Sequence, residues 1–214
     1  MSKNKDQRID LTRFKFIVKG LGVGLIVGFV VSLFRFFIEI GLHYALIAYH
    51  YMRSHPIYII PWALLMLLIA LINSRLIKKD PDIMGSGIPQ VEGQLAGEME
   101  MNWWSVLWRK WVGGVLAIAS GLFLGREGPS IQLGAAVGQG FAEKTNHKGV
   151  GRRVLIAGGA AAGLSAAFNA PIASSLFVLE EVYHNFSPLI WTTALSSAIA
   201  SDFISMNFFG LTPV

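Results

Sequence analysis

The sequence predicts an all-α integral membrane protein built from broken and re-entrant helices, and three observations support this fold class. First, 53% of the 214 residues are hydrophobic and only 14% are charged, whereas a typical soluble domain carries about 25% charged residues. Second, apolar stretches fill most of the chain, and one crossing of a bilayer takes roughly 20 apolar residues. Third, breaks containing Gly and Pro interrupt these stretches. The chain therefore needs lipid as its solvent.

The first third of the chain predicts a polar segment and two spans. Residues 1–13 are polar and basic, and we expect them to form a cytoplasmic segment ahead of one membrane domain, residues 14–214. Residues 14–49 predict a long, tilted helix, and residues 57–77 predict a second span. Three glycines, four residues apart, give the long helix a face that another helix can approach closely: Gly20, Gly24 and Gly28.

The later apolar stretches are shorter. Residues 88–97 cannot cross a bilayer and predict at most a half-helix. Residues 103–124 open with an interfacial tryptophan cluster and predict a span that stops at Gly125. Four further helical segments are expected: residues 129–142, 151–168, 171–183 and 188–209.

The breaks between helices share one pattern, in which Gly, Ser or Asn precedes a proline in the first helical turn. Examples are Gly-Ser-Gly-Ile-Pro at 85–89, Gly-Arg-Glu-Gly-Pro at 125–129 and Asn-Ala-Pro at 169–171. Proline is tolerated at a helix start because its missing N–H would be unpaired there anyway. Inside a membrane, non-helical backbone is tolerated only where it is buried in protein or lines a cavity. Repeated starts of this kind indicate a binding site.

The net charge of +5 is better explained by membrane topology than by nucleic-acid binding, because the basic residues lie in short segments between apolar stretches. Placing four basic clusters in the cytoplasm gives a self-consistent scheme in which the N-terminus is cytoplasmic and the last helix ends outside. The four basic clusters are Lys3, Lys5, Arg8 and Arg13; Arg75, Lys78 and Lys79; Arg109 and Lys110; and Lys144, Lys148, Arg152 and Arg153.

Two of the helix starts, at Ser86 and at Glu127, are candidate anion sites. A helix N-terminus offers unpaired N–H groups and about half a positive charge. At ~4 Å and an effective dielectric of ~20, each start contributes roughly 2 kcal/mol toward a chloride ion. Two starts fall short of the several kcal/mol that desolvating an ion costs. A complete site should therefore need more donors than this chain supplies.

Each candidate side chain has a simpler alternative role. The Ser86 hydroxyl can donate to an anion, but it can equally cap its helix. The Glu127 carboxylate can imitate an anion and leave on protonation, and carboxylates inside membranes are functional candidates by default. The alternative for Glu127 is a salt bridge with Arg126. The histidines show no metal-ligand spacing, so we expect no metal site.

These motifs resemble the CLC family of chloride channels and chloride/proton antiporters. The resemblance rests on residues 85–89, on residues 125–129 and on Ala-Ala-Gly-Leu-Ser-Ala-Ala-Phe-Asn-Ala-Pro at 161–171, which runs on to Glu180 and Glu181. It extends from the first span to the C-terminus. The fold that it implies is the first half of an inverted-repeat helical bundle.

The resemblance implies a role for each site residue. Ser86, the N–H groups of Gly87 and Ile88, and Gly128 would bind the anion. Glu127 would be the gating glutamate, and Glu181 would be the inner proton glutamate of the antiporters. By the same resemblance, serine at position 86 is associated with chloride. Glu180 and Glu181 have a simpler alternative role as an interfacial helix end.

The resemblance also implies what is missing. Family members consist of two inverted repeats, and this sequence contains only the first. We therefore expect a complementary second repeat, as the rest of a longer protein or as a companion chain, and homodimers of complete units in a bacterial-type plasma membrane. The expected function is proton-coupled chloride exchange, with chloride as the only ligand and no cofactor. Two alternatives stay open: a passive gated chloride channel, and an assembly half that conducts nothing alone.

Overall fold

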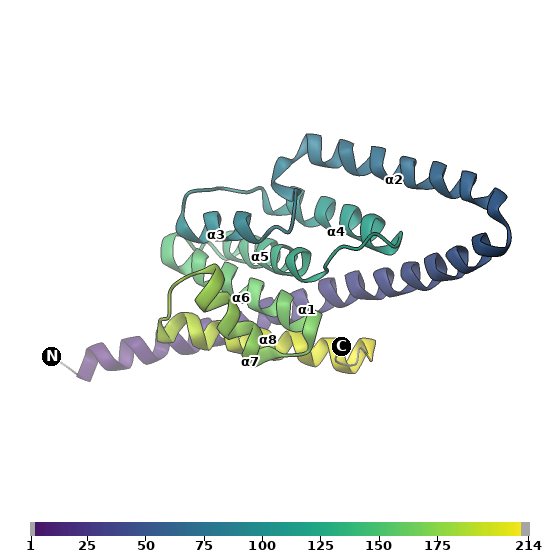
Figure 1. Ribbon diagram of the computed structural model, residues 1–214. Helices are drawn as coiled ribbons and strands as arrows, with labels where there is room; N and C mark the ends of the chain where they lie inside the picture. The colour runs from purple at the N-terminus through teal and green to yellow at the C-terminus, as the bar shows by residue number, and fades with distance from the viewer. Residues whose placement is uncertain (1–2, 211–214) are drawn as a thin grey trace.

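The computed structural model describes residues 3–210, and side chains from residue 11 onward. Apart from short 3-10 and π-helical turns, the described elements are α-helices joined by short connections (Figure 1). They are α1 (Lys3–Ser54), η1 (Pro56–Tyr58), α2 (Ile59–Lys79), η2 (Pro81–Ile83), α3 (Ile88–Ala96), α4 (Trp103–Ala119), α5 (Glu127–Lys144), α6 (Gly149–Phe168), α7 (Pro171–Phe177), η3 (Val178–Val182) and α8 (Pro188–Phe209). Lys3, Lys5 and Arg8 of the first predicted basic cluster lie outside the described side chains.

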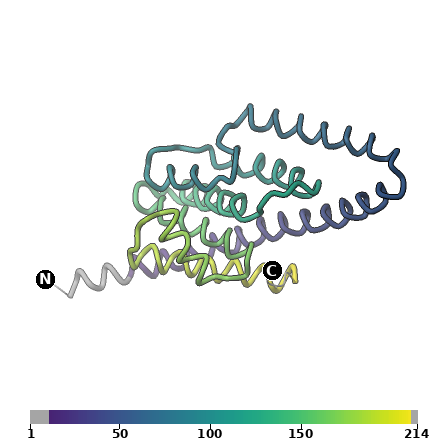
Figure 2. Tube along the Cα trace, viewed as in Figure 1, coloured from purple at the N-terminus to yellow at the C-terminus, as the bar shows by residue number. Residues whose placement is uncertain are grey.

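Helix α1 runs along the whole molecule, and α2 runs back at an angle as the second arm of an open hairpin and packs against α4 (Figures 1 and 2). The predicted glycine face of α1 packs against α8. A Cβ atom at Gly20 or Gly28 would lie 2.6 Å from Ser196 Oγ or 2.8 Å from the Ser201 carbonyl oxygen, and one at Gly24 would overlap the Ser197 carbonyl. The glycines therefore let the two backbones approach closely, as the sequence predicts.

Helices α5 and α6 form the centre of the bundle, and most of their residues are buried. Gly134 and Gly163 provide the contact between them, because a Cβ atom at either position would overlap the backbone of the other helix. Helix α6 also contacts α1, α7 and α8, while α5 contacts α4 and α3. Small residues thus build a core from close backbone contact rather than from large side chains.

Three described helical segments are long and apolar enough to cross a membrane: Leu11–Ser54, Pro56–Lys79 and Pro188–Phe209. Helix α2 differs from the other two, because none of its residues is buried. The predicted segments 88–97, 129–142, 151–168 and 188–209 agree with α3, α5, α6 and α8 to within two residues at each end. The fold is therefore the all-helical membrane fold that the sequence predicts.

The predicted boundaries of α4 and α1 are wrong, and α1 also continues to Ser54, past its predicted end at residue 49. Helix α4 ends at Ala119 rather than at residue 124, because Gly121 adopts a positive φ of 87° and its N–H bonds to the Ile118 carbonyl. The Ser120 carbonyl then accepts a hydrogen bond from the Tyr49 hydroxyl at 3.1 Å instead of continuing the helix. At the other end, α1 begins at Lys3 instead of at residue 14.

Candidate functional site

The start of α3 and the start of α5 lie against each other. Gly87, with a φ of 93°, caps α3, and Arg126 caps α5. A Cβ atom at Gly128 would lie 2.7 Å from both the Cβ and the carbonyl oxygen of Ser86, so only glycine permits this contact. Two helix N-termini, which attract anions, therefore meet at one place.

The Ser86 side chain is exposed beside this contact. Its hydroxyl oxygen accepts a hydrogen bond from the Ile88 N–H at 3.3 Å. This bond satisfies one N–H of the helix start, but Gly87 rather than Ser86 is the N-cap residue of α3. The same hydroxyl still has a hydrogen that it can donate, because a serine hydroxyl both donates and accepts.

Glu127 is half-buried in the first turn of α5. Within the described part of the chain, its carboxylate forms no ion pair and no hydrogen bond. Arg126 instead pairs with Glu39 of α1, at 3.5 Å. The alternative prediction of a salt bridge between Arg126 and Glu127 is therefore wrong, and the carboxylate lies unpaired beside the helix starts.

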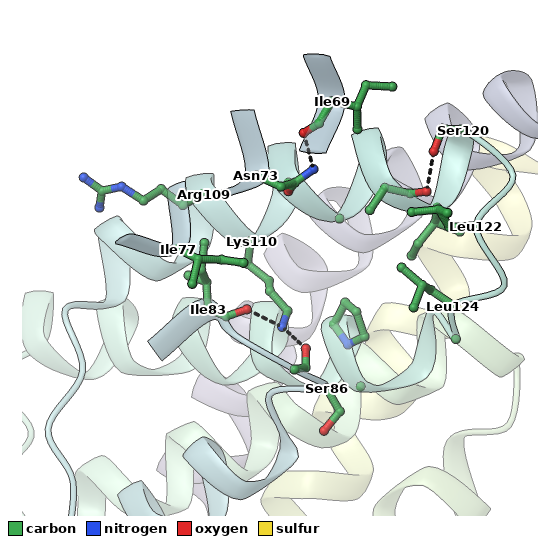
Figure 3. A pocket seen from close by; sticks show the side chains of 18 of the residues that line it. Ile69, Asn73, Ile77, Ile83, Ser86, Arg109, Lys110, Ser120, Leu122 and Leu124 are labelled. Atoms are coloured by element: carbon green, nitrogen blue, oxygen red, sulfur yellow. Dashed lines mark hydrogen bonds between the residues drawn. The ribbon is translucent and has the colours of Figure 1, made fainter. Parts of the chain in front are cut away.

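A cavity of about 880 Å³ lies between α2, α4 and the two helix starts (Figure 3). Its walls are mostly apolar. Ser86, Ile88, Glu127 and Gly128 all line it, so four of the six predicted site residues share one space. The other polar and charged lining residues are Asn73, Arg109, Lys110 and Ser120.

Side-chain donors hold four successive carbonyl groups of the loop that leads to Ser86. Gln132 Nε2 donates to the Asp82 carbonyl at 2.7 Å, and Gln90 Nε2 donates to the Met84 carbonyl at 2.9 Å. Lys110 Nζ donates to the carbonyls of Ile83 and Gly85, at 2.9 and 2.7 Å. In a trans peptide the C=O and the next N–H point in opposite directions. The Lys110 contact therefore turns the Gly85 carbonyl toward the lysine and aims the Ser86 N–H away from it.

Lys110 is 5% exposed and reaches the floor of the cavity from α4 (Figure 3). Sequence analysis placed it in a basic cluster at the cytoplasmic surface and missed this contact. The sequence did carry a signal, because Lys110 lies four residues after Val106 and three before Gly113, and all three are buried on one face of α4. A lysine on the apolar face of a helix needs a polar partner, and here the partner is backbone.

Glu181 lies apart from the other site residues. It belongs to η3, which packs against α3 and α6, and its side chain is exposed. It does not line the cavity. Glu180, on the same turn, is exposed as well. Gly87, the sixth predicted residue, is buried behind Ser86 and faces Gln132, where a Cβ atom would overlap the amide.

Comparison with known proteins places this geometry in a family. The family model described as voltage gated chloride channel matches residues 65–214. The H(+)/Cl(−) exchange transporter ClcA of Vibrio cholerae serotype O1 is 45% identical over 127 residues, which cover 58% of this chain and 27% of that protein. The H(+)/Cl(−) exchange transporter ClcA of Vibrio parahaemolyticus is 38% identical over 182 residues, which cover 82% of this chain and 38% of that protein.

Two solved structures share the fold. A slow cyanobacterial Cl−/H+ antiporter superposes with a TM-score of 0.82 at 32% identity, over 92% of this chain and 48% of that one. A CLC-type fluoride/proton antiporter superposes with a TM-score of 0.73 at 25% identity, over 94% of this chain and 48% of that one. The chain therefore spans about half the length of these structures. It is a partial CLC unit and belongs to the CLC family.

Proposed function

We propose that the chain is the anion-binding first repeat of a proton-coupled chloride exchanger. The observation that carries the proposal is the contact of Gly128 with Ser86, which brings two helix N-termini and the unpaired Glu127 to one cavity. Two starts together attract an anion with about 4 kcal/mol, taking about half a charge at each. That the relatives are named as chloride/proton exchangers supports the choice of ions.

In this proposal, chloride binds at the start of α3, to the Ser86 hydroxyl and the N–H groups of Gly87 and Ile88, with Gly128 giving it room. The Glu127 carboxylate competes for the same positive helix starts. Protonation removes its charge, so the carboxyl group leaves and an anion takes its place. The site therefore holds either the ionised carboxylate or the chloride ion, and never two negative charges at once.

Glu181 is the proposed proton entry from the cytoplasm. Its exposure on η3 supports access from water, and the contact of η3 with α3 supports a short route to the central site. Glu181 does not line the cavity, however. This favours a second candidate function, a passive chloride channel in which Glu127 gates and Glu181 carries no proton. The two functions differ in whether chloride flux moves protons.

A complementary second repeat completes the site in this proposal. The support is the open cavity between α2 and α4, together with the 48% coverage of the solved antiporters. The third candidate, an assembly half that conducts nothing alone, is the same chain without this second repeat. We further propose that complete units form homodimers, and that the N-terminus of this multi-pass membrane protein is cytoplasmic.

The test is chloride-driven proton movement in liposomes that contain the chain with and without a second CLC repeat. Exchange predicts uphill proton movement that needs the second repeat and is lost in Glu127→Gln and in Glu181→Gln. Glu98→Gln, an exposed carboxylate outside the cavity, is the control and should keep full activity. Chloride flux without proton movement would reject exchange in favour of the channel.

A further inference from the structure

Two charged residues in the middle of the apolar helix α1 connect separate breaks of the bundle. Arg35 is 1% exposed, and its Nη1 donates to the Ala166 carbonyl at 2.6 Å and to Asn169 Oδ1 at 3.0 Å. Asn169 ends α6 with a positive φ of 55°. Arg35 therefore holds the turn between α6 and α7 from the side of α1.

One turn later, the Glu39 carboxylate lies between two guanidinium groups. Its Oε1 is 3.8 Å from Arg35 Nη2 and 3.5 Å from Arg126 Nη1. The Glu39 side chain is 45% exposed, whereas that of Arg126 is 19% exposed. Glu39 thus fixes the direction of the guanidinium on the residue that immediately precedes Glu127.

The position of Arg126 decides whether Glu127 is free. Without the Glu39 carboxylate, the partly buried guanidinium would seek another anion, because an unpaired cation is costly there. The neighbouring carboxylate is that of Glu127. An Arg126–Glu127 pair would hold Glu127 ionised and in place, although the proposed exchange needs it to take up a proton and move.

We propose that Glu39 is a positioning residue that draws Arg126 away from Glu127 and so keeps the gating carboxylate mobile. The inference rests on the proposed function for its effect on transport, but its structural core, the choice of partner by Arg126, stands on its own. Glu39 acts here through Arg126 and does not touch the transported ions.

Two substitutions release Arg126 in different ways. Glu39→Gln removes the charge. Glu39→Asp keeps a negative charge near Arg35 but has a shorter side chain, which does not reach Arg126. It therefore tests the same contact even if Glu39→Gln fails to fold. We expect each to lower chloride and proton flux of the complete assembly about fivefold, the factor that a partly exposed ion pair contributes.

Combining each variant with Arg126→Gln separates positioning from a merely structural role. If Glu39 acts through Arg126, the double variants should show the flux of Arg126→Gln alone, above that of the Glu39 single variants. A loss that Arg126→Gln does not relieve would overturn the inference. Glu100→Gln is the matched control, because it breaks a glutamate–arginine pair with Arg152 away from the cavity and should leave flux unchanged.

A second measurement needs no transport. The purified chain is treated with a carbodiimide, which reacts with accessible protonated carboxyl groups, and modification of Glu127 is followed by mass spectrometry. We expect about fivefold slower labelling in Glu39→Gln and Glu39→Asp, with recovery on adding Arg126→Gln. Unchanged labelling in both would refute the role of Glu39. Inert wild-type liposomes with the expected labelling would instead reject the proposed function alone.

Discussion

The side of the molecule where α1, α5, α6 and α8 meet differs from the side where α2 faces α4 in what separates the helices. On the first side backbones touch, since Gly24 and Gly134 leave no space for a methyl group. On the second side lies a cavity of about 880 Å³, and no residue of α2 is buried. The Ser86 and Glu127 helix starts open on this second side.

This contrast separates the part of the chain that specifies the fold from the part that holds the candidate site. Close contact of small residues gives dispersion energy and helix association without polar groups, which suits a scaffold in lipid. On the cavity side, polar groups and the lysine Lys110 line a mostly apolar space. Such a lining suits a site that a further element closes. Substitutions should therefore change stability alone on the first side, and should change ion binding as well on the second.

The largest effect is expected from a substitution that disrupts the closely packed contact between α1 and α8. Gly24→Ala puts a methyl group into the Ser197 carbonyl, so the α1–α8 contact must separate, at a cost of about 3 kcal/mol. Gly22→Ala is the matched control on the same helix, because its Cβ would meet the Phe141 ring at an ordinary 3.6 Å. Thermal unfolding in detergent measures both. Equal melting temperatures would show that this contact is not tight in solution.

The second-largest expected effect is on the cavity side, where Lys110 supports the loop before Ser86. Lys110→Met removes the donor to the Ile83 and Gly85 carbonyls, so we expect a loss of stability of about 2 kcal/mol and weaker chloride binding. Calorimetric titration of the complete assembly with chloride measures the affinity. Lys78→Met, at the exposed end of α2, should change neither quantity. Unaltered chloride affinity in Lys110→Met would show that the Ser86 loop keeps its peptide orientation without the lysine.

The smallest effect concerns pH, at the connection between α5 and α6. Burial and the nearby Lys19 ammonium lower the pKa of His147 below its ordinary value of 6.5. Lys19 Nζ donates to His147 Nε2 at 2.6 Å, which requires the neutral ring. The unfolded chain therefore binds the proton more readily, and stability is complete above pH 6.5 and falls as the pH drops below it.

The expected loss is well under about 1 kcal/mol, because the contact is only partly buried. Melting temperatures across this pH range should show it, and His147→Gln should flatten the profile. A profile that is already flat in the wild type would contradict the contribution of this contact.

Most helices could be predicted because Gly, Pro and apolar length mark them directly. The starts at Ile88, Pro171 and Pro188 coincide with the predicted ones. The end of α4 could not be predicted, since Leu122, Phe123 and Leu124 continue the apolar pattern while Gly121 has already turned the chain. Apolar composition does not distinguish a helix in lipid from an exposed apolar loop.

The two helix starts of the candidate site were predictable from motifs, but the side chains that support them were not. Ser86 and Glu127 stand in recognisable glycine-rich breaks. Lys110 and Gln132 donate to carbonyls far away in sequence, and a single chain does not reveal such pairs. Arg35 and Glu39 did leave a signal, since charges inside an apolar helix are functional candidates, and their spacing of four residues places them on one face.

The attachment of α2 has a mechanical consequence. This helix is held at one end by Tyr49 and Trp62, whose rings lie 5.2 Å apart, and at the other by Asp80, which pairs with Arg109 at 3.4 Å. Between these contacts α2 packs against α4 on one side only, and none of its residues is buried. We therefore expect lateral pressure or a change in bilayer thickness to bend or tilt α2 before it moves the closely packed helices α1, α5, α6 and α8. Because α2 forms one wall of the cavity, we expect the width of the cavity to change with the thickness of the surrounding bilayer.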